Sequence, residues 1–151
     1  MKPVVFLRIA SVLTLIHSIL HTVGGVFGKP AAGIQAATVA VMKANEFAVF
    51  GVTRTYFDFM RGLGLAVTVL LTAESIVFWQ LGTLAKTDAA RLRPIVATFL
   101  VAYLVLAVNS YTYIFMGPVI TEIVIAACLG MAIATAKAAE PSRAGSPALA
   151  S

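Results

Sequence analysis

The chain has 151 residues, of which 60% are hydrophobic and only 11% are charged. In a soluble domain of this size roughly a quarter of the residues are charged. The charged residues of this chain are too few to cover the surface of a globular protein, so the remaining apolar surface needs lipid. The net charge of +5 does not indicate nucleic-acid binding, because the basic residues lie in short connections and tails rather than along a polar element with interleaved aromatic residues.

Four segments are long and apolar enough to cross a bilayer as helices, which takes about 20 residues each. The first exceeds the apolar region of a cleaved signal peptide and contains Arg8, so we expect it to be retained. The sequence therefore predicts one all-α membrane domain within residues 1–137, a bundle of four transmembrane helices. The spans are expected at about residues 4–26, 57–84, 93–111 and 115–137.

One connection is much longer than the others and joins the first two spans. Its Ala-rich part, residues 31–43, predicts a short interfacial helix, and residues 46–52 are β-prone or irregular. Such an extended connection is either a lid or binding loop or a plain interfacial connector, and the sequence leaves both open. The tail, residues 138–151, is rich in Ala, Ser, Pro and Gly and is predicted to be a disordered cytoplasmic segment.

The distribution of positive charge predicts an orientation. Seven basic residues fall on the side of both termini and three on the side of the long connection, and the positive side of a membrane protein is usually cytoplasmic. We therefore expect both termini to be cytoplasmic and the long connection to be extracytoplasmic. The seven are Lys2, Arg8, Lys86, Arg91, Arg93, Lys137 and Arg143, and the three are Lys29, Lys43 and Arg54.

Polar residues within the spans are the candidate functional residues, because they are costly in lipid and usually face a protein interior or a wet cavity. We expect Arg61 to pair with Asp58, Glu122 or both. Glu74 lies on the far side of its helix from Arg61, and it faces a neighbouring helix, pairs with His17 or marks an oligomer contact. The residues predicted to line one pocket in the outer half of the bilayer are His17, His21, Asp58, Arg61, Asn109 and Glu122.

Helical phase supports this pocket. His17 and His21 are four residues apart and share one helix face. One stripe of the second span and one side of the third are expected to turn inward; the stripe is Asp58, Arg61, Thr68, Thr72 and Ser75, and the side is Thr98, Ala102, Asn109 and Tyr113. In the competing interpretation, these groups only join helices through hydrogen bonds worth about 1 kcal/mol or less each.

The histidine pair has the spacing of metal ligands on a helix, but no glutamate lies between the two residues and a third ligand would have to come from Glu122 or Asp58. No phosphate-binding glycine loop and no G-x-S-x-G motif are present either. We therefore expect no metal and no cofactor, and no nucleotide or hydrolase chemistry.

Three stretches resemble a family of small bacterial four-pass membrane proteins. They are His21-Thr22-Val23-Gly24-Gly25, the ten residues from Tyr56 to Leu65, and Phe78-Trp79-Gln80-Leu81-Gly82-Thr83-Leu84-Ala85. The pattern is HTxGG … YxxFxRGxGL, and the resemblance covers residues 5–136, nearly the whole chain before the tail. The resemblance implies four spans in a bacterial inner membrane and implies no activity; its most recognisable positions are His21, Gly24, Arg61, Gly62 and Gly64. A looser likeness to sterol-isomerase-type four-helix proteins is an analogy of fold only.

Three functions fit these features. The first is a non-enzymatic protein that binds a small amphipathic or lipidic ligand in the polar pocket, or serves as an assembly subunit. The second is a membrane enzyme that transfers protons, with His21 and Glu122 as acid and base. The third is a transporter or channel, which would have to be a homo-oligomer because four helices are too few for an inverted-repeat transporter. Membrane lipids are expected partners in every case.

Overall fold

The structure, a computed structural model, describes residues 2–136. It confirms an all-α protein with four helices long and apolar enough to span a membrane. The predicted disordered tail, residues 138–151, lies outside the described residues. The elements are α1 (Pro3–Leu20), a π-helical continuation η1 (His21–Val26), α2 (Ile34–Ala44), strands β1 (Glu46–Val49) and β2 (Val52–Thr55), α3 (Tyr56–Asp88), a 3-10 turn η2 (Ala90–Leu92), α4 (Arg93–Tyr113) and α5 (Met116–Thr135).

Local sequence explains where the long helices begin. Pro3 and Pro94 lie in the first turns of α1 and α4. Proline fits there because backbone N–H groups in the first turn of a helix have no hydrogen-bond partner within the helix. Thr55 caps α3, because its hydroxyl oxygen accepts a hydrogen bond from the backbone N–H of Asp58 at 3.0 Å. The second span runs four residues past its expected end at Leu84, to Asp88, because polar residues at the membrane surface are compatible with a continuing helix.

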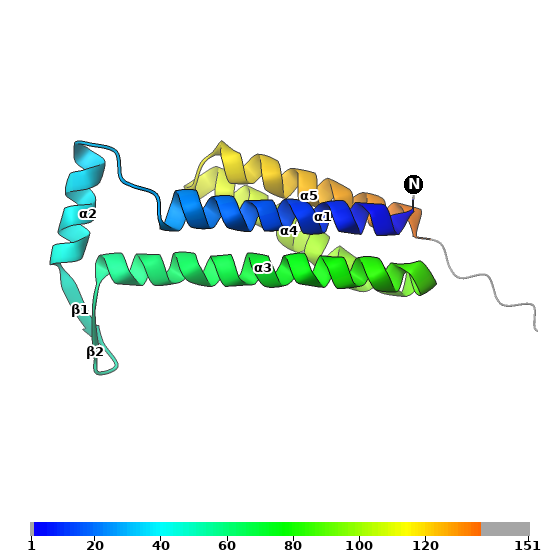
Figure 1. Cartoon of the computed structure of the whole chain (residues 1–151), viewed down its shortest axis with the longest axis horizontal. Helices are drawn as coiled ribbons and strands as arrows, with labels where there is room; N and C mark the ends of the chain where they lie inside the picture. Colours follow the sequence, from blue (N-terminus) through cyan, green and yellow to red (C-terminus); the bar gives the residue numbers. More distant parts are fainter. Residues whose placement is uncertain (1, 137–151) are drawn as a thin grey trace, which may run out of the picture.

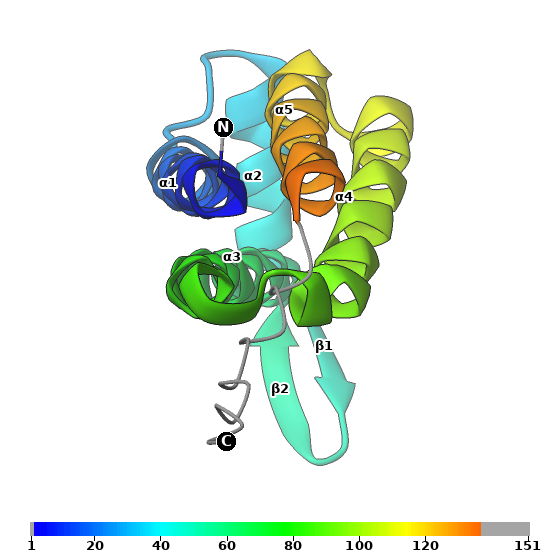
Figure 2. The same ribbon diagram turned by 90° about the vertical axis from the view of Figure 1, so that its right-hand side faces the viewer.

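The bundle consists of two helical hairpins. Helices α1 and α3 lie side by side and antiparallel (Figure 1), and α4 and α5 form the second hairpin, joined by a turn at residues 114–115. Helix α1 packs against α5, and the view along the bundle shows the four spans around a common axis (Figure 2). Aromatic rings connect α3 to α4, with the Phe78 ring centroid 5.0 Å from that of Phe99 and 6.0 Å from that of Tyr103.

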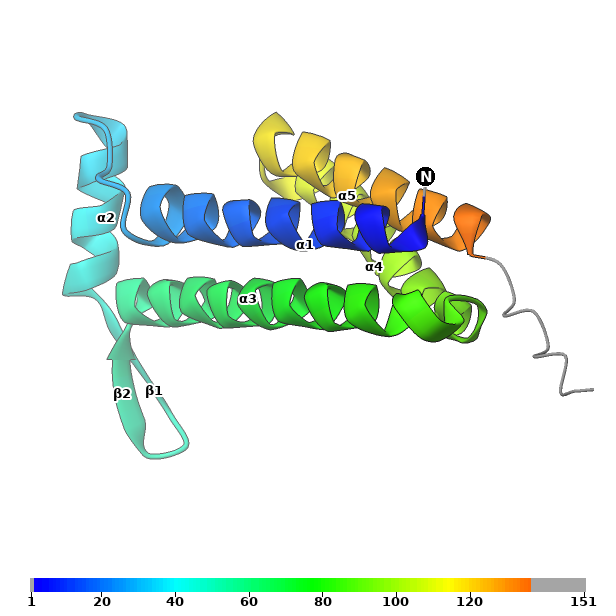
Figure 3. The ribbon, with the colours of Figure 1, turned by 45° about the vertical axis from the view of Figure 1, so that its right-hand side comes forward.

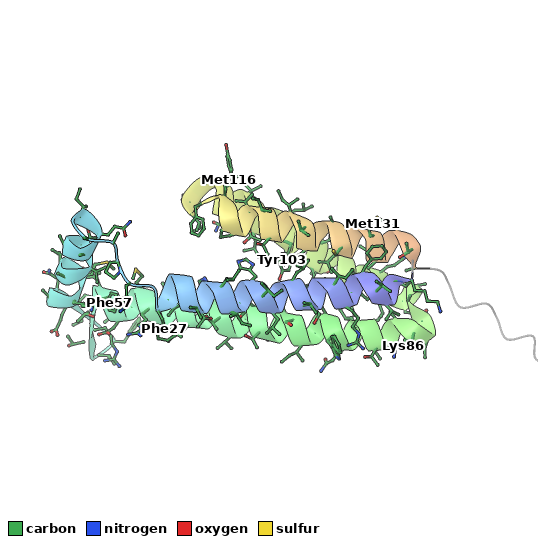
Figure 4. The ribbon with its side chains drawn as sticks, turned by 45° about the horizontal axis from the view of Figure 1, so that its top comes forward. Phe27, Phe57, Lys86, Tyr103, Met116 and Met131 are labelled. Carbon is green, nitrogen blue, oxygen red and sulfur yellow. The ribbon has the colours of Figure 1, made fainter. Side chains whose placement is uncertain are left out.

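The apolar core occupies one half of the bundle. We call the end where α1 begins and α5 ends the terminal end, and the end near α2 the connection end. Core residues come from the terminal half of every span; they are Leu7, Ala10, Phe78, Leu81, Ala85, Val96, Tyr103, Ile125, Ala126, Leu129 and Ala132. Toward the connection end the α4–α5 hairpin diverges from α1 and α3, and α5 lies farther from α1 at Met116 than at Met131 (Figure 4).

The long connection folds over the connection end. Helix α2 runs across the direction of the spans (Figures 1 and 3), and none of its residues is buried. It corresponds to the interfacial helix expected within residues 31–43. The segment predicted to be β-prone or irregular contains β1, which pairs with β2 in an antiparallel hairpin. Val49 of β1 pairs with Val52 of β2. Helix α3 has 33 residues and is about 50 Å long, so it is about 20 Å longer than the hydrocarbon core of a bilayer. Helices α1 and α3 extend past the α4–α5 turn toward α2 (Figure 1).

Candidate functional site

A row of hydroxyl side chains joins α1 to α3. Ser11 and Ser75 each donate a hydrogen bond to the backbone carbonyl of the other residue, at 2.7 and 2.9 Å. Ser18 shares a hydrogen bond of 2.9 Å with the Thr72 hydroxyl and donates to the Thr68 carbonyl. Small hydroxyl-bearing residues let two helices approach closely in a membrane and bond across the interface. The expected inward stripe of the second span is therefore confirmed for Thr68, Thr72 and Ser75.

His21 closes this row at the connection end. Its Nε2 lies 3.0 Å from the carbonyl oxygen of Gly64, and since a carbonyl can only accept, Nε2 carries the proton. A side chain on Gly64 would place Cβ 2.9 Å from a γ-methyl of Val26, so glycine is needed for the close approach of η1 to α3. In this arrangement the Nε2 of His21 donates to the backbone of α3 rather than facing Glu122.

Arg61 does not form the expected ion pair. Its guanidinium lies 4.7 Å from the ring centroid of Phe27 and 6.0 Å from that of Phe57, which lie near the connection end (Figure 4). Within residues 2–136 the one salt bridge joins Arg91 to Asp88. The pairing predicted with Asp58 or Glu122 is therefore wrong, because Arg61 projects toward the aromatic residues at the end of α1, where a cation is stabilised by ring faces.

Two further predicted pocket residues lie apart from the bundle interior. Asp58 is exposed and accepts a hydrogen bond from the hydroxyl of Thr55, so its carboxylate belongs to the cap of α3. Asn109 is exposed on α4. The prediction of which side of α4 faces inward is wrong, since the buried residues of this helix are Val96, Tyr103, Ala107 and Ser110. The reason is that α4 is apolar nearly all round, which leaves its phase poorly defined by sequence.

Glu74 faces a neighbouring helix, one of its three predicted roles. Its Oε2 accepts a hydrogen bond of 2.8 Å from the hydroxyl of Tyr103 on α4. Since that hydroxyl has one proton, the Thr14 hydroxyl of α1, 3.2 Å away, donates to Tyr103. Tyr103 lies in the middle of the bundle (Figure 4), so three helices meet here through one chain of hydrogen bonds.

Arg8 is held between side chains of α3 nearer the terminal end. Its guanidinium carbon lies 3.4 Å from the ring centroid of Trp79, and its Nη2 donates to the Thr83 hydroxyl at 2.8 Å. A Cβ on Gly82 would lie 3.2 Å from Nε of Arg8, so the missing side chain leaves room for the guanidinium. The charge is therefore stabilised by a ring face and a hydroxyl within the bundle.

Among residues 2–136, Glu122 and His17 each carry a buried atom without a hydrogen-bond partner, as Arg8 does at Nη1. Glu122 is 5% exposed; its Oε1 accepts a bond of 2.9 Å from the Ser110 hydroxyl, and its Oε2 has no partner. The Nδ1 of His17 is likewise buried and unpaired. A buried polar atom left unpaired costs about 1–3 kcal/mol, so each such atom calls for an explanation.

The packing of α1 on α5 places these two residues at the same level. On α1, Leu7, Ala10 and Thr14 are buried at spacings of three and four residues, and His17 is next in this series. On α5 the matching series is Ala132, Leu129 and Ile125, with Glu122 next. His17 lies 14 residues after Pro3 and Glu122 lies 13 residues before Thr135, so both are about 20 Å from the terminal end.

The arrangement suits binding of a polar group. Within residues 2–136 no three His, Cys, Asp or Glu side chains gather as metal ligands. A carboxylate oxygen and an imidazole nitrogen at one level offer an acceptor for a hydroxyl or amine and a second group that accepts or donates according to its tautomer. Sequence reasoning selected both residues but missed Tyr103, Ser110 and Thr14, whose only signal in the sequence was a polar atom within an apolar span.

The chain matches no protein-family model, no curated protein and no solved structure. The resemblance to small bacterial four-pass proteins therefore stays a prediction.

Proposed function

We propose that this protein is a non-enzymatic membrane protein that binds the polar group of a small amphipathic or lipidic molecule between α1 and α5. The observation that supports this function is the pair of buried, unpaired atoms, Nδ1 of His17 and Oε2 of Glu122, at one level of two packed helices. A ligand hydroxyl or amine that bonds either atom would remove the cost of burying that atom unpaired.

The shape of the bundle supports entry from the bilayer. The packed apolar core lies in the terminal half, whereas toward the connection end α5 diverges from α1 (Figures 1 and 4). We expect an amphipathic molecule to reach this half of the bundle from the bilayer, with its apolar part in lipid. The proposed site uses two of the six residues predicted from sequence; Ser110 holds the Glu122 carboxylate in place from α4.

We place the protein in a bacterial inner membrane with both termini cytoplasmic, which makes the divergent half of the bundle the outer half. The described basic residues at the terminal end support this orientation; they are Lys2, Arg8, Lys86, Arg91 and Arg93. The opposite end carries Lys29, Lys43 and Arg54 in the long connection. Protease accessibility of the connection in oriented vesicles tests this orientation.

Native mass spectrometry in mild detergent tests the binding function. We expect wild-type protein to carry a co-purifying lipid or small molecule that His17→Leu and Glu122→Gln both lose. Asn109→Leu is the matched control, because it removes an exposed polar group from α4, and it should retain the molecule. If wild-type protein carries nothing and His17→Leu only raises the unfolding temperature, the two residues are buried structural groups and the proposal fails.

A further inference from the structure

The hairpin that follows α2 has an unusual turn. Phe50 and Gly51 form its two-residue loop with φ of 48° and 78°, between the paired residues Val49 and Val52. Two positive φ values are the geometry of a type I′ turn, in which Asn, Asp or Gly is preferred at the first position. A bulky aromatic residue at positive φ is strained, and such strain points to a functional role for the side chain.

The same turn is the most exposed apolar point of the described chain. The side chain of Phe50 is fully exposed, at 101% of its reference area, and Val49 and Val52 beside it are 43% and 42% exposed. These four residues, Val49 to Val52, form an apolar tip, of which the Phe50 side chain is the fully exposed part. Exposure of a phenylalanine side chain to water is unfavourable, so this conformation is stabilised only where the surroundings of the side chain are themselves apolar.

The position of the hairpin directs this tip toward lipid. Seen along the bundle, the hairpin projects past the outline of the four spans (Figure 2), so lipid rather than protein lies beneath it. Seen from the side, its tip leans back toward the spans (Figure 3). The first turns of α3 stand beyond the hydrocarbon core because the helix is about 20 Å longer than that core, and strands of four residues reach about 13 Å.

A groove with mainly apolar walls lies between the hairpin and the first turns of α3. It has a volume of about 290 Å³ and is lined by Arg54, Asp58, Phe59, Gly62 and Leu63. Within residues 2–136 the guanidinium of Arg54 bonds the adjacent Thr53 carbonyl alone, which leaves its other donors for a ligand. The lining suits a zwitterionic phospholipid, since the Arg54 donors match its phosphate, the Asp58 carboxylate matches its ammonium group and the apolar residues match the first part of an acyl chain.

We propose that the hairpin inserts into the outer leaflet, with the Phe50 side chain among the acyl chains and a phospholipid headgroup in the groove against Arg54. The hairpin then fixes α2 and the outer end of α3 at the membrane surface. This interaction is independent of the His17–Glu122 site, because it uses a different surface of the molecule.

Fluorescence quenching in nanodiscs tests the insertion. In a Cys128→Ala background, Val52→Cys places a fluorophore beside the tip while Phe50 stays in place, and Thr38→Cys on α2 is the control position. We expect lipids with nitroxide-labelled acyl chains to quench the Val52 probe several-fold more than the Thr38 probe, and aqueous iodide to show the reverse order. Equal quenching at the two positions would overturn the proposal.

Phe50→Asn separates insertion from folding of the hairpin. Asparagine is preferred at this turn position, so the hairpin is expected to form at least as well as in the wild type. Acyl-chain quenching at Val52 should nevertheless fall several-fold. Unchanged quenching in Phe50→Asn, or quenching that disappears when the nanodiscs hold one copy each, would show that the tip is not a lipid anchor.

Discussion

Ser11 of α1 and Ser75 of α3 exchange hydrogen bonds across the bundle, each hydroxyl donating to the carbonyl oxygen of the other residue. Both residues are nearly buried, with exposures of 4% and 5%. The bonds fix the register of the two helices, because a shift by one residue would leave both hydroxyls without these carbonyls.

Substitution at this pair should distinguish bonding from packing. We expect Ser75→Ala to lower the free energy of unfolding by about 1 kcal/mol or less, because one interhelical bond is lost. Ser75→Leu should cost about 1–3 kcal/mol by forcing α1 and α3 apart. Denaturation in mixed micelles measures both changes. Thr112→Ala is the control, since Thr112 is exposed and bonds only within α4; an equal loss there would refute the assignment.

Gly64→Ala should destabilise the contact of α3 with η1. The added Cβ would lie 2.9 Å from a γ-methyl of Val26, and relieving such overlap costs about 1–3 kcal/mol. Gly62→Ala, two residues earlier, meets nothing within 4 Å and should leave the unfolding midpoint unchanged. Val26→Ala should restore most of the loss in the Gly64→Ala background. Equal effects at the two glycines would contradict this prediction.

The fluorescence of Trp79 should depend on its contact with Arg8. It is the only tryptophan of the chain, and the Arg8 guanidinium lies 3.4 Å from its ring centroid. Arg8→Gln should therefore change the Trp79 emission and cost about 1 kcal/mol of stability. Arg91→Gln removes an exposed charge that pairs with Asp88 and should leave the emission as in the wild type. A Trp79 spectrum unaffected by Arg8→Gln would show that the contact is not maintained.

The bond between Tyr103 and Glu74 should show strong coupling. Tyr103→Phe leaves the Glu74 carboxylate and the Thr14 hydroxyl without this partner, and we expect a loss of about 1–3 kcal/mol. Combining it with Glu74→Leu should recover part of that loss, since both polar partners are then replaced. Thermal unfolding of the two single variants and the double variant gives the coupling energy; strictly additive losses would be the contrary result.

The sequence predicted the parts of the fold that length and composition control. Twenty apolar residues can satisfy their backbone groups in lipid only as a helix, so the four spans followed directly. The inward stripe of α3 was also predictable, because Thr68, Thr72 and Ser75 are regularly spaced on an otherwise apolar helix. The positions of Asp58 and Arg61 on the same stripe were misleading, since α3 extends beyond the bundle at that end.

Partners of individual side chains were not predictable. In α4 the amide of Asn109 drew attention to one side, whereas Tyr103 and Ser110 face the interior on another. The surface of α4 is apolar on nearly every side, so the periodicity of its sequence does not separate a lipid-facing side from a protein-facing side. The pairing of Glu74 with Tyr103 depends on how α4 is rotated and tilted, and only the packed structure determines those angles.

The α1–α3 interface also has a consequence for biogenesis. All its bonds lie within residues 3–88, so the first half of the chain can assemble in the bilayer before the second half leaves the ribosome. The second half, whose turn at residues 111–117 carries no charge, can then enter the lipid as a helical pair without moving a charged turn across it. A nascent chain that ends after Asp88 should already hold α1 against α3.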